Sequence, residues 1–311
     1  MNIALANLLP IFIAFVLGFN LRRFYRGLNM NVVERTSNVC LYCLLILMGV
    51  TIGLIPGIFQ KLSLVGLNAI SIAVGSSLSI AIVLAVFHIK TRSNYEDEID
   101  RSTAQKTSFD MIDYVKDPLQ LGALVLIGFA VSVYNVTPYL NYDIIISTLL
   151  YLLIFIIAIK LSHSGLELKT IFFNRRNIAM TLCTVLASYF GAAVISLFIP
   201  LSLTQSLAVS SGFGWYTLSG ILFTKMGDPL LGSVAFICDL SREVIALLLI
   251  PTLSRVGNGN IAIGVAGATA MDVTLPIIEK HCGVSYVPVA LLSGGIITII
   301  VPFLIPFFFS L

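Results

Sequence analysis

Charged residues are scarce in this sequence. Only 11% of its 311 residues are Asp, Glu, Lys or Arg, and 58% are hydrophobic, whereas a soluble globular protein has about 25% charged residues. This deficit excludes a single large soluble core, because the excess apolar surface has to face lipid. The apolar runs have the length of spanning helices and do not alternate as barrel strands do. The sequence therefore predicts an all-α polytopic membrane protein, with residues 1–311 forming one transmembrane domain.

Signal and metal motifs are missing as well. The first ten residues contain no Lys or Arg, so the charged start of a secretory signal is absent and the first apolar segment is expected to stay as an anchor. Cys40 and Cys43 have the C-x-x-C spacing of metal and redox sites, but they lie in an apolar segment without a second pair or a nearby His. We interpret them as packing residues. No metal, cofactor or nucleic-acid partner is expected; the lipid bilayer is.

Eight apolar segments are long enough to cross a bilayer as helices. They cover approximately residues 3–21, 37–55, 64–89, 119–136, 143–161, 178–200, 231–254 and 286–308. Two more apolar segments, 205–224 and 259–280, are interrupted by Gly or Pro. If both of these crossed, there would be ten spans; if both are re-entrant, there are eight. We favour eight, because the broken segments then enter from opposite faces and flank the intact segment 231–254. Such paired interruptions mark the binding sites of transporters.

Basic residues are distributed unequally between alternate loops. With the N-terminus outside, the loops after the first, third and fifth segments contain thirteen Lys and Arg, with Lys160 counted in the last of them. The loops after the second, fourth and sixth contain one, Lys61. The positive-inside rule therefore predicts that both termini are outside. The longest polar stretch, 90–119, is then a cytoplasmic loop.

Three carboxylates and one guanidinium lie where the surrounding sequence predicts bilayer. A charge in hydrocarbon is costly, so it normally faces a protein cavity and is used there. Asp239 and Glu243 are four residues apart and share one helix face. Arg242 can neutralise only one of them, and we interpret it as a structural counter-ion. Glu243 is the simplest candidate for the carboxylate left to exchange protons, with Asp239 as a further candidate for binding substrate or protons.

Asp272 is the third intramembrane acid. It lies in a segment containing Gly264, Gly267 and Pro276, which predict unwound backbone, and no basic residue lies within one helical turn. An acid in this setting is a candidate for binding substrate or protons. Capping of a broken helix end is the alternative role, and the two roles are compatible.

Small, hydroxyl and aromatic residues cluster in the two broken segments. Free backbone groups and hydroxyls could hold the carboxylate or ammonium group of a zwitterion, and aromatic rings could stack on an aliphatic cation. The alternative is close helix packing through small residues. The candidate substrate contacts are Ser211, Gly212, Gly214, Trp215, Tyr216, Thr217, Ser219, Thr269 and Thr274. Residues 205–280 are therefore predicted to form the region that binds substrate and ions.

Three motifs in order resemble one family. They run from Gly212 to Leu222, from Asp239 to Glu243 and from Ala268 to Pro276. Together they resemble the bacterial lysine exporter LysO family, closely over about 205–305 and more loosely through the N-terminal half. The resemblance implies an inner-membrane exporter of L-lysine and of toxic lysine analogues, with about eight spans and both termini outside. It also implies that two intramembrane acids matter for transport, and by motif these are Glu243 and Asp272.

The intramembrane charges suit a cationic substrate. Lysine carries one net positive charge, and the four ionised groups of this region carry a net charge of −2. Moving one charge across the membrane costs about 2.3 kcal/mol per 100 mV. Electroneutral export of lysine therefore needs at least one proton to move inward, and exchange for protons would let the proton gradient drive export.

Two other functions fit the same acids less well. A cation/proton antiporter would use them to bind Na⁺ or another cation. An intramembrane aspartyl protease would use Asp239 and Asp272 as a pair, but the Gly-x-Gly-Asp tetrapeptide usual in such enzymes is missing. We therefore expect a transporter and not an enzyme.

Overall fold

The computed structural model describes residues 3–24, 29–91, 111–134, 141–163, 175–256 and 259–311. Within these residues all regular structure is helical, with 12 α-helices and no strand, which confirms the predicted fold class. Four helical stretches are long and apolar enough to span a membrane by length and composition alone, namely 30–53, 58–86, 177–196 and 287–309. Together with the shorter apolar helices they make the chain a polytopic membrane protein.

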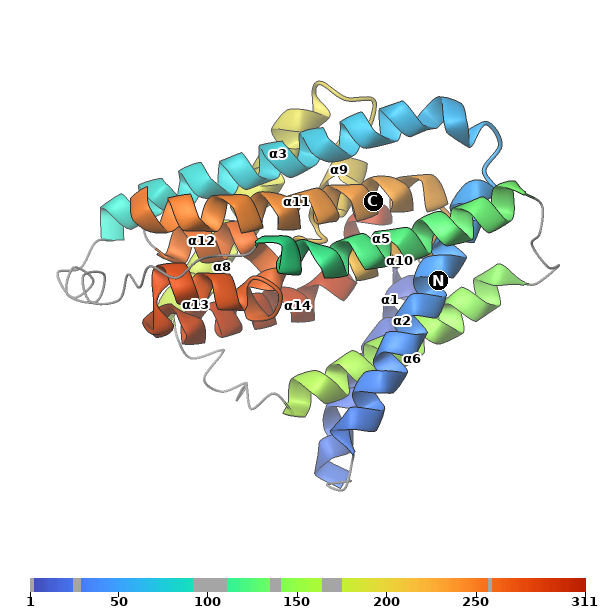
Figure 1. The fold of residues 1–311 in the computed structure, drawn as a ribbon, viewed down its shortest axis with the longest axis horizontal. Coiled ribbons are helices and arrows are strands. Elements are labelled where there is room, and N and C mark those ends of the chain that lie inside the picture. Colours follow the sequence, from blue (N-terminus) through green and yellow to red (C-terminus); the bar gives the residue numbers. More distant parts are fainter. Residues whose placement is uncertain (1–2, 25–28, 92–110, 135–140, 164–174, 257–258) are drawn as a thin grey trace.

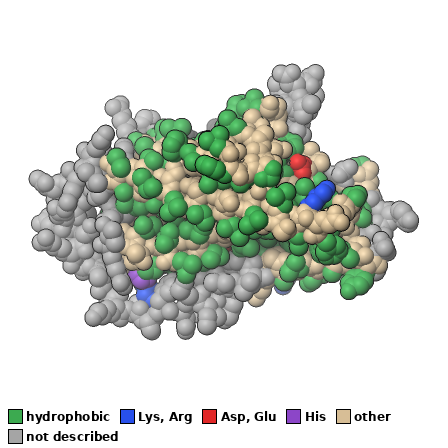
Figure 2. All heavy atoms as spheres, turned by 90° about the horizontal axis from the view of Figure 1, so that it is seen from above, with side chains coloured by type: hydrophobic (Ala, Val, Ile, Leu, Met, Phe, Trp, Pro, Cys, Tyr) green, Lys and Arg blue, Asp and Glu red, His purple; other side chains and the backbone are tan. Residues whose placement is uncertain are grey.

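The surface has the apolar character of a lipid-facing protein. In the face shown in Figure 2, hydrophobic side chains are spread over the described area and charged ones are few. On one helix the exposed apolar residues recur every four positions, as in Leu182, Leu186, Phe190 and Val194. This spacing places them along a single stripe. Water would make such a stripe costly, and lipid does not.

Eight long helices match the eight predicted spans. They are α1 (Ile3–Phe24), α2 (Met30–Gly53), α3 (Ile58–Thr91), α5 (Met111–Val133), α6 (Tyr142–His163), α8 (Arg175–Ser196), α11 (Pro229–Val256) and α14 (Val287–Phe309). Several extend past the apolar segment into polar residues, because a helix keeps its own backbone hydrogen bonds wherever the side chains point. Two predictions are corrected by this. The polar loop predicted over 90–119 is shorter, since α3 continues to Thr91 and α5 begins at Met111. Lys160 belongs to α6 and not to a loop.

The long helices pack in two groups. In the first group α2 packs along α5, α1 packs along α6, and α2 also contacts α6. In the second group α3 packs along α8 and α11, and α14 contacts the short helices. Contacts between the groups are fewer and involve mainly α14 with α1, and α10 with α2 and α6. Figure 1 shows α1, α2 and α6 to one side of α3, α8 and α11.

The two Gly-rich segments are broken helices, as the sequence predicts. The first consists of α9 (Leu203–Ser210) and α10 (Tyr216–Lys225), separated by non-helical residues 211–215. The second consists of α12 (Gly259–Ala266), the 3₁₀ turn η1 (Gly267–Met271) and α13 (Leu275–Cys282). The α-helical halves contain only 8 or 10 residues. An isolated helix shorter than about 12–15 residues is marginally stable, so tertiary contacts must hold these halves.

Both broken segments reverse direction and leave by the side on which they entered. One apolar cluster joins the start of α8, the end of α11 and the start of α12, through Met180, Ile250 and Ile261. The end of α8 and the start of α11 therefore lie together on the other side, and α9 and α10 connect these two points. The second segment begins at Gly259, which packs on the ring of Tyr286 just after α13. The two hairpins thus enter the helix bundle from opposite ends, which is the re-entrant arrangement that the eight-span prediction assumes.

Candidate functional site

Two charged residues of α11 bind the two helix ends that face the first break, the end of α9 and the start of α10. The Asp239 carboxylate accepts a hydrogen bond from the Gly214 N–H, with 2.8 Å between nitrogen and Oδ1. Arg242 Nη1 donates to the Ser210 carbonyl at 3.0 Å, where α9 ends. A helix carries partial positive charge at its N-terminus and partial negative charge at its C-terminus. The anion therefore lies at the start of α10 and the cation at the end of α9, and both side chains are fully buried.

The backbone of the first break is shaped to receive this carboxylate. Phe213 and Gly214 have φ angles of 49° and 91°, a region that a side chain disfavours. A Cβ on Gly212 would overlap the Asp239 carboxylate. The Phe213 ring lies over the guanidinium, with its centroid 5.4 Å from the Arg242 carbon, which is within the range of a cation–π contact. The Gly-Phe-Gly sequence thus lets α11 present two charges to the backbone of the break.

Threonines close the second break. The Thr269 hydroxyl donates to the Ala266 carbonyl at 2.9 Å, and the Thr274 hydroxyl donates to the Thr269 carbonyl at 2.9 Å. The Thr269 carbonyl also accepts from the N–H groups of Asp272 and Thr274, so the hydroxyl bonds add to the backbone bonds that close this turn. Asp272 follows η1, and its Oδ1 accepts from the Val273 N–H at 2.6 Å.

The tips of the two hairpins touch. The Ala268 N–H of the second break donates to the Phe213 carbonyl of the first at 3.0 Å. Gly267 precedes this contact with a φ of 64°, and a Cβ there would lie 2.5 Å from the same carbonyl oxygen. The two irregular segments therefore satisfy each other's backbone, as polar backbone at membrane depth requires.

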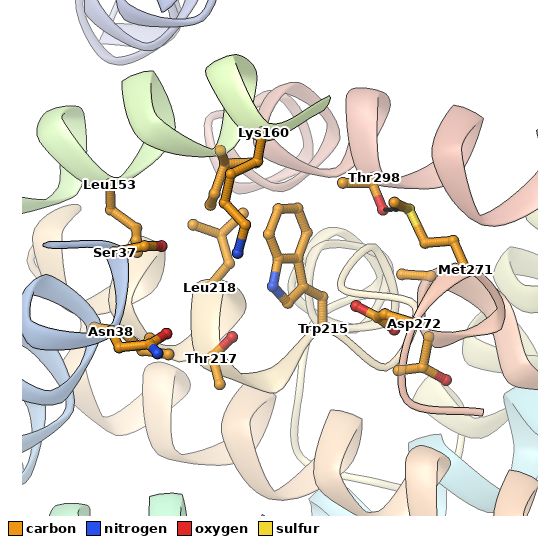
Figure 3. A pocket seen from close by; sticks show the side chains of 14 residues that line it. Ser37, Asn38, Leu153, Lys160, Trp215, Thr217, Leu218, Met271, Asp272 and Thr298 are labelled. Carbon is orange, nitrogen blue, oxygen red and sulfur yellow. Dashed lines mark hydrogen bonds between the residues drawn. The ribbon is translucent and has the colours of Figure 1, made fainter. Parts of the chain in front are cut away.

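A cavity of about 380 Å³ lies beside this junction, between the two helix groups. Ligand pockets generally measure about 300–1,000 Å³, so a small molecule is the size of ligand it can take. Its walls come from α2, α6, both breaks, α10 and α14, and Figure 3 shows the labelled side chains converging on it. The lining residues are Ser37, Asn38, Leu41, Leu153, Ile157, Lys160, Trp215, Thr217, Leu218, Ala268, Thr269, Met271, Asp272 and Thr298.

Four of the predicted site residues line this cavity. They are Trp215, Thr217, Thr269 and Asp272. Asp272 is accessible to solvent, although protein surrounds most of the residue. Its side chain points into the cavity (Figure 3).

The other predicted residues do not line the cavity. They are Ser211, Gly212, Gly214, Tyr216, Ser219, Thr274, Asp239, Arg242 and Glu243. Tyr216 packs edge-on against Phe236, with ring centroids 5.5 Å apart. The Ser211 hydroxyl lies 3.0 Å from the hydroxyl of Tyr189. Glu243 is 1% exposed, on the same helix as Asp239. Except for Thr274, which belongs to the second break, these residues lie in the first hairpin or on α11.

Lys160 is a cavity residue that sequence reasoning missed. It reaches into the cavity from α6 (Figure 3) and is close enough to Asp272 for their charges to interact. The positive-inside count treated it as one more loop cation. Its position within three residues of the end of an apolar segment was the available signal, because a lysine there can extend toward either the interface or the protein interior.

The geometry does not assemble an aspartyl dyad. Such a dyad needs two carboxylates that share one site. Asp239 is fully buried against the Gly214 amide, whereas Asp272 lines the cavity. Within the described ranges, no group of three or more His, Cys, Asp or Glu side chains could hold a metal ion.

Known proteins resemble this chain over most of its length. A family model described as lysine exporter LysO matches residues 122–309. The chain is 33% identical to the lysine exporter LysO of Escherichia coli (strain K12) over 281 residues, covering 90% of this chain and 91% of the relative. It belongs to the lysine exporter LysO family. A candidate lysine exporter of Haemophilus influenzae is 40% identical over 158 residues, which are 51% of this chain and 80% of that protein. No solved structure matches.

The match to the LysO family model includes every part of the hairpin junction. It covers both broken helices, α11 and α14, together with the cavity residues of α6. The cavity residues of α2 lie before it. Membership supports amino-acid export across a membrane as the activity, and the resemblance that the motifs indicate is confirmed.

Proposed function

We propose that this protein is a secondary transporter that exports L-lysine, and toxic lysine analogues, across the bacterial inner membrane in exchange for protons. The observation that carries the proposal is the Asp272 carboxylate in a cavity beside two touching re-entrant hairpins. Irregular backbone at membrane depth occurs where a protein lines a polar cavity. A carboxylate in such a cavity can bind either the ammonium group of lysine or a proton, but not both at once.

This mutual exclusion supplies the coupling. When Asp272 holds a proton, it has no charge with which to attract a cationic substrate. Glu243 is the second proton site in this proposal, as the family resemblance implies. Asp239, also predicted to bind substrate or protons, is given the structural role of holding the first break through Gly214.

The net charge of the region supports one lysine per site. When Lys160 is added to the four intramembrane charges predicted from the sequence, one net negative charge remains. A bound lysine, with one net positive charge, then gives a neutral complex. Neutrality lowers the electrostatic cost of moving the loaded site through a medium of low dielectric constant.

The location of the cavity supports loading from the cytoplasm. Its α2 residues, Ser37 and Asn38, lie in the first half of that helix, and its α6 residues lie in the second half. With the N-terminus outside, α2 begins and α6 ends on the cytoplasmic side. The cavity is therefore on the side from which an exporter takes its substrate.

Uptake of labelled lysine into inverted membrane vesicles tests the proposal, because their outer surface is the cytoplasmic one. We expect uptake that is accelerated when the vesicle interior is acidic, and loss of most of it in Asp272→Asn and in Glu243→Gln. Glu34→Gln is the matched control, since Glu34 is exposed on α2 and does not line the cavity. It should transport as the wild type does.

Three outcomes would contradict this account. If lysine uptake does not depend on the pH gradient, the proposal of proton exchange is wrong. If uptake is unimpaired in both variants, the transport roles assigned to Asp272 and Glu243 are wrong. A sodium-dependent pH change in the same vesicles, without any response to lysine, would instead identify a cation/proton antiporter.

A further inference from the structure

The cavity contains one cation and one anion on different walls. Lys160 enters from α6, in the first helix group, and Asp272 enters from the second break, in the other group. Figure 3 shows the Lys160 ammonium directed into the cavity, with the Trp215 indole between it and Asp272 in this view. A site for a simple cation gains nothing from a lysine in its wall, because like charges repel.

Much of the cavity lining is apolar. It includes Leu153, Ile157, Leu218 and the Trp215 ring, and of these labelled side chains only Trp215 lies between the two charges in Figure 3. Hydroxyl and amide groups, such as those of Asn38 and Thr217, lie around this apolar part (Figure 3). A ligand that fits has an anionic end, an aliphatic middle and a cationic end. An amino acid with a long aliphatic side chain ending in an ammonium group has this arrangement.

We propose that Lys160 binds the α-carboxylate of the substrate and thereby selects an amino acid over the corresponding diamine. The inference rests on the proposed function and extends it to the orientation of the substrate. The α-carboxylate pairs with the Lys160 ammonium, the aliphatic chain packs on Trp215, and the side-chain ammonium pairs with Asp272. The bound substrate thus joins the two helix groups: its α-carboxylate contacts the first group and its side-chain ammonium contacts the second.

The preference for an amino acid over a diamine follows from the contact between Lys160 and the α-carboxylate of the substrate. A diamine offers Lys160 a second cation in place of an anion, so an attraction becomes a repulsion. Sites built to bond a polar group strongly reject an analogue that lacks it, because the protein group loses its partner. Lysine and 1,5-diaminopentane differ only in the α-carboxylate, so comparing them isolates this contact.

Calorimetric binding of the two ligands to the full-length protein in detergent tests the proposal. The wild type should bind L-lysine more tightly than 1,5-diaminopentane. Lys160→Gln should weaken lysine binding by about tenfold or more, as loss of a hydrogen bond to a charged group implies. It should leave diamine binding unchanged or tighter, so the preference for lysine collapses. Lys160→Arg keeps the cation and should retain the preference.

Lys61→Gln is the matched control. Lys61 is an exposed residue near the start of α3 and does not line the cavity, so this variant removes the same charge elsewhere. It should bind both ligands as the wild type does. A Lys160→Gln protein that binds lysine as well as the wild type, or better, would overturn the proposal. A wild type that binds neither ligand would count against the proposed function itself, which separates the two failures.

Discussion

Asp239 and Arg242 lie three residues apart on α11, and each is bonded to a different end of the first broken helix. A buried charge costs several kcal/mol unless other groups compensate it. Here the compensation comes from backbone groups of another segment as well as from the neighbouring opposite charge. The pair therefore fixes where the first hairpin meets α11.

Neutralising one member of this pair should destabilise the protein more than neutralising both. Asp239→Asn keeps an acceptor for the Gly214 amide but leaves Arg242 without its neighbouring anion, so we expect a loss of about 3 kcal/mol. Asp239→Asn combined with Arg242→Gln removes both charges and should cost less than Asp239→Asn alone. The measurement is thermal unfolding in detergent, followed by the fluorescence of Trp215, the one tryptophan in the sequence.

Additive losses in this cycle would show that the two charges act independently. Asp272→Asn is the matched control, because its carboxylate lines the cavity and its bond to Val273 can be kept by an amide. It should unfold within about one degree of the wild type, in line with surface changes that remove no buried partner.

At the scale of helices, the junction of the two hairpins depends on one backbone hydrogen bond and one glycine. Gly267 has the φ of 64° that brings η1 under the Phe213 carbonyl. A residue with a side chain destabilises this position in two ways, through the left-handed backbone conformation and through contact with the carbonyl oxygen. The tips cannot approach as closely with any other residue at this position.

Gly267→Ala should therefore lower the free energy of unfolding by about 2 kcal/mol or more and reduce lysine transport. Gly66→Ala in α3 is the control, since a Cβ there meets nothing within 4 Å. Its helix should become up to about 1 kcal/mol more stable. Thermal unfolding and vesicle uptake of both variants check this. Equal stability of the two proteins would mean that the junction is not tightly packed in the membrane.

The breaks could be predicted from the sequence, and the cavity could not. Interrupted hydrophobicity is a property of a single segment, so Gly212, Gly267 and Pro276 are enough to locate both breaks. The cavity depends on which faces of α2, α6 and α14 meet, and hydropathy treats each segment separately. Hydropathy therefore places Lys160 with the loop cations, and it gives no reason to select Asn38. For the same reason the sequence does not distinguish between the polar residues of the breaks, although Thr269 lines the cavity and Thr274 does not.

The whole molecule consists of two helix groups with the cavity between them. A rocking rotation of one group against the other is the motion that would change the side of the membrane to which the cavity opens. The hairpins belong to the second group and Lys160 to the first, so the walls separate when the groups move. This arrangement supplies a physical basis for alternating access in the proposed transport cycle.

Labelling from each side of the membrane tests the orientation and the open side together. Cysteine introduced at Asn38, in the cavity wall, should react with an impermeant maleimide in inverted vesicles but not in intact cells. Added lysine should slow the reaction, because the substrate fills the cavity. Cysteine introduced at Gln60, an exposed residue near the start of α3, should show the opposite sidedness. The wild type is the baseline, because it already contains an exposed thiol at Cys43.

Each way of failing has its own meaning. If both positions react from the side opposite to the expected one, the predicted orientation is wrong. If only the Asn38 position does so, the chain is oriented as predicted and the cavity opens to the outside.

The order of the hairpins along the chain also governs how the protein can be made. Both breaks fall in the last third of the sequence, and the backbone of Met271 packs against Gly294 of α14, the last helix. Lipid offers no hydrogen bonds to a broken helix. During synthesis the second hairpin is made before α14, so it can pack against α11 at once but gains its contact with α14 only after the last helix has been made. A chain cut short before residue 287 would contain every intramembrane charge and yet lack the helix that closes the site around Asp272.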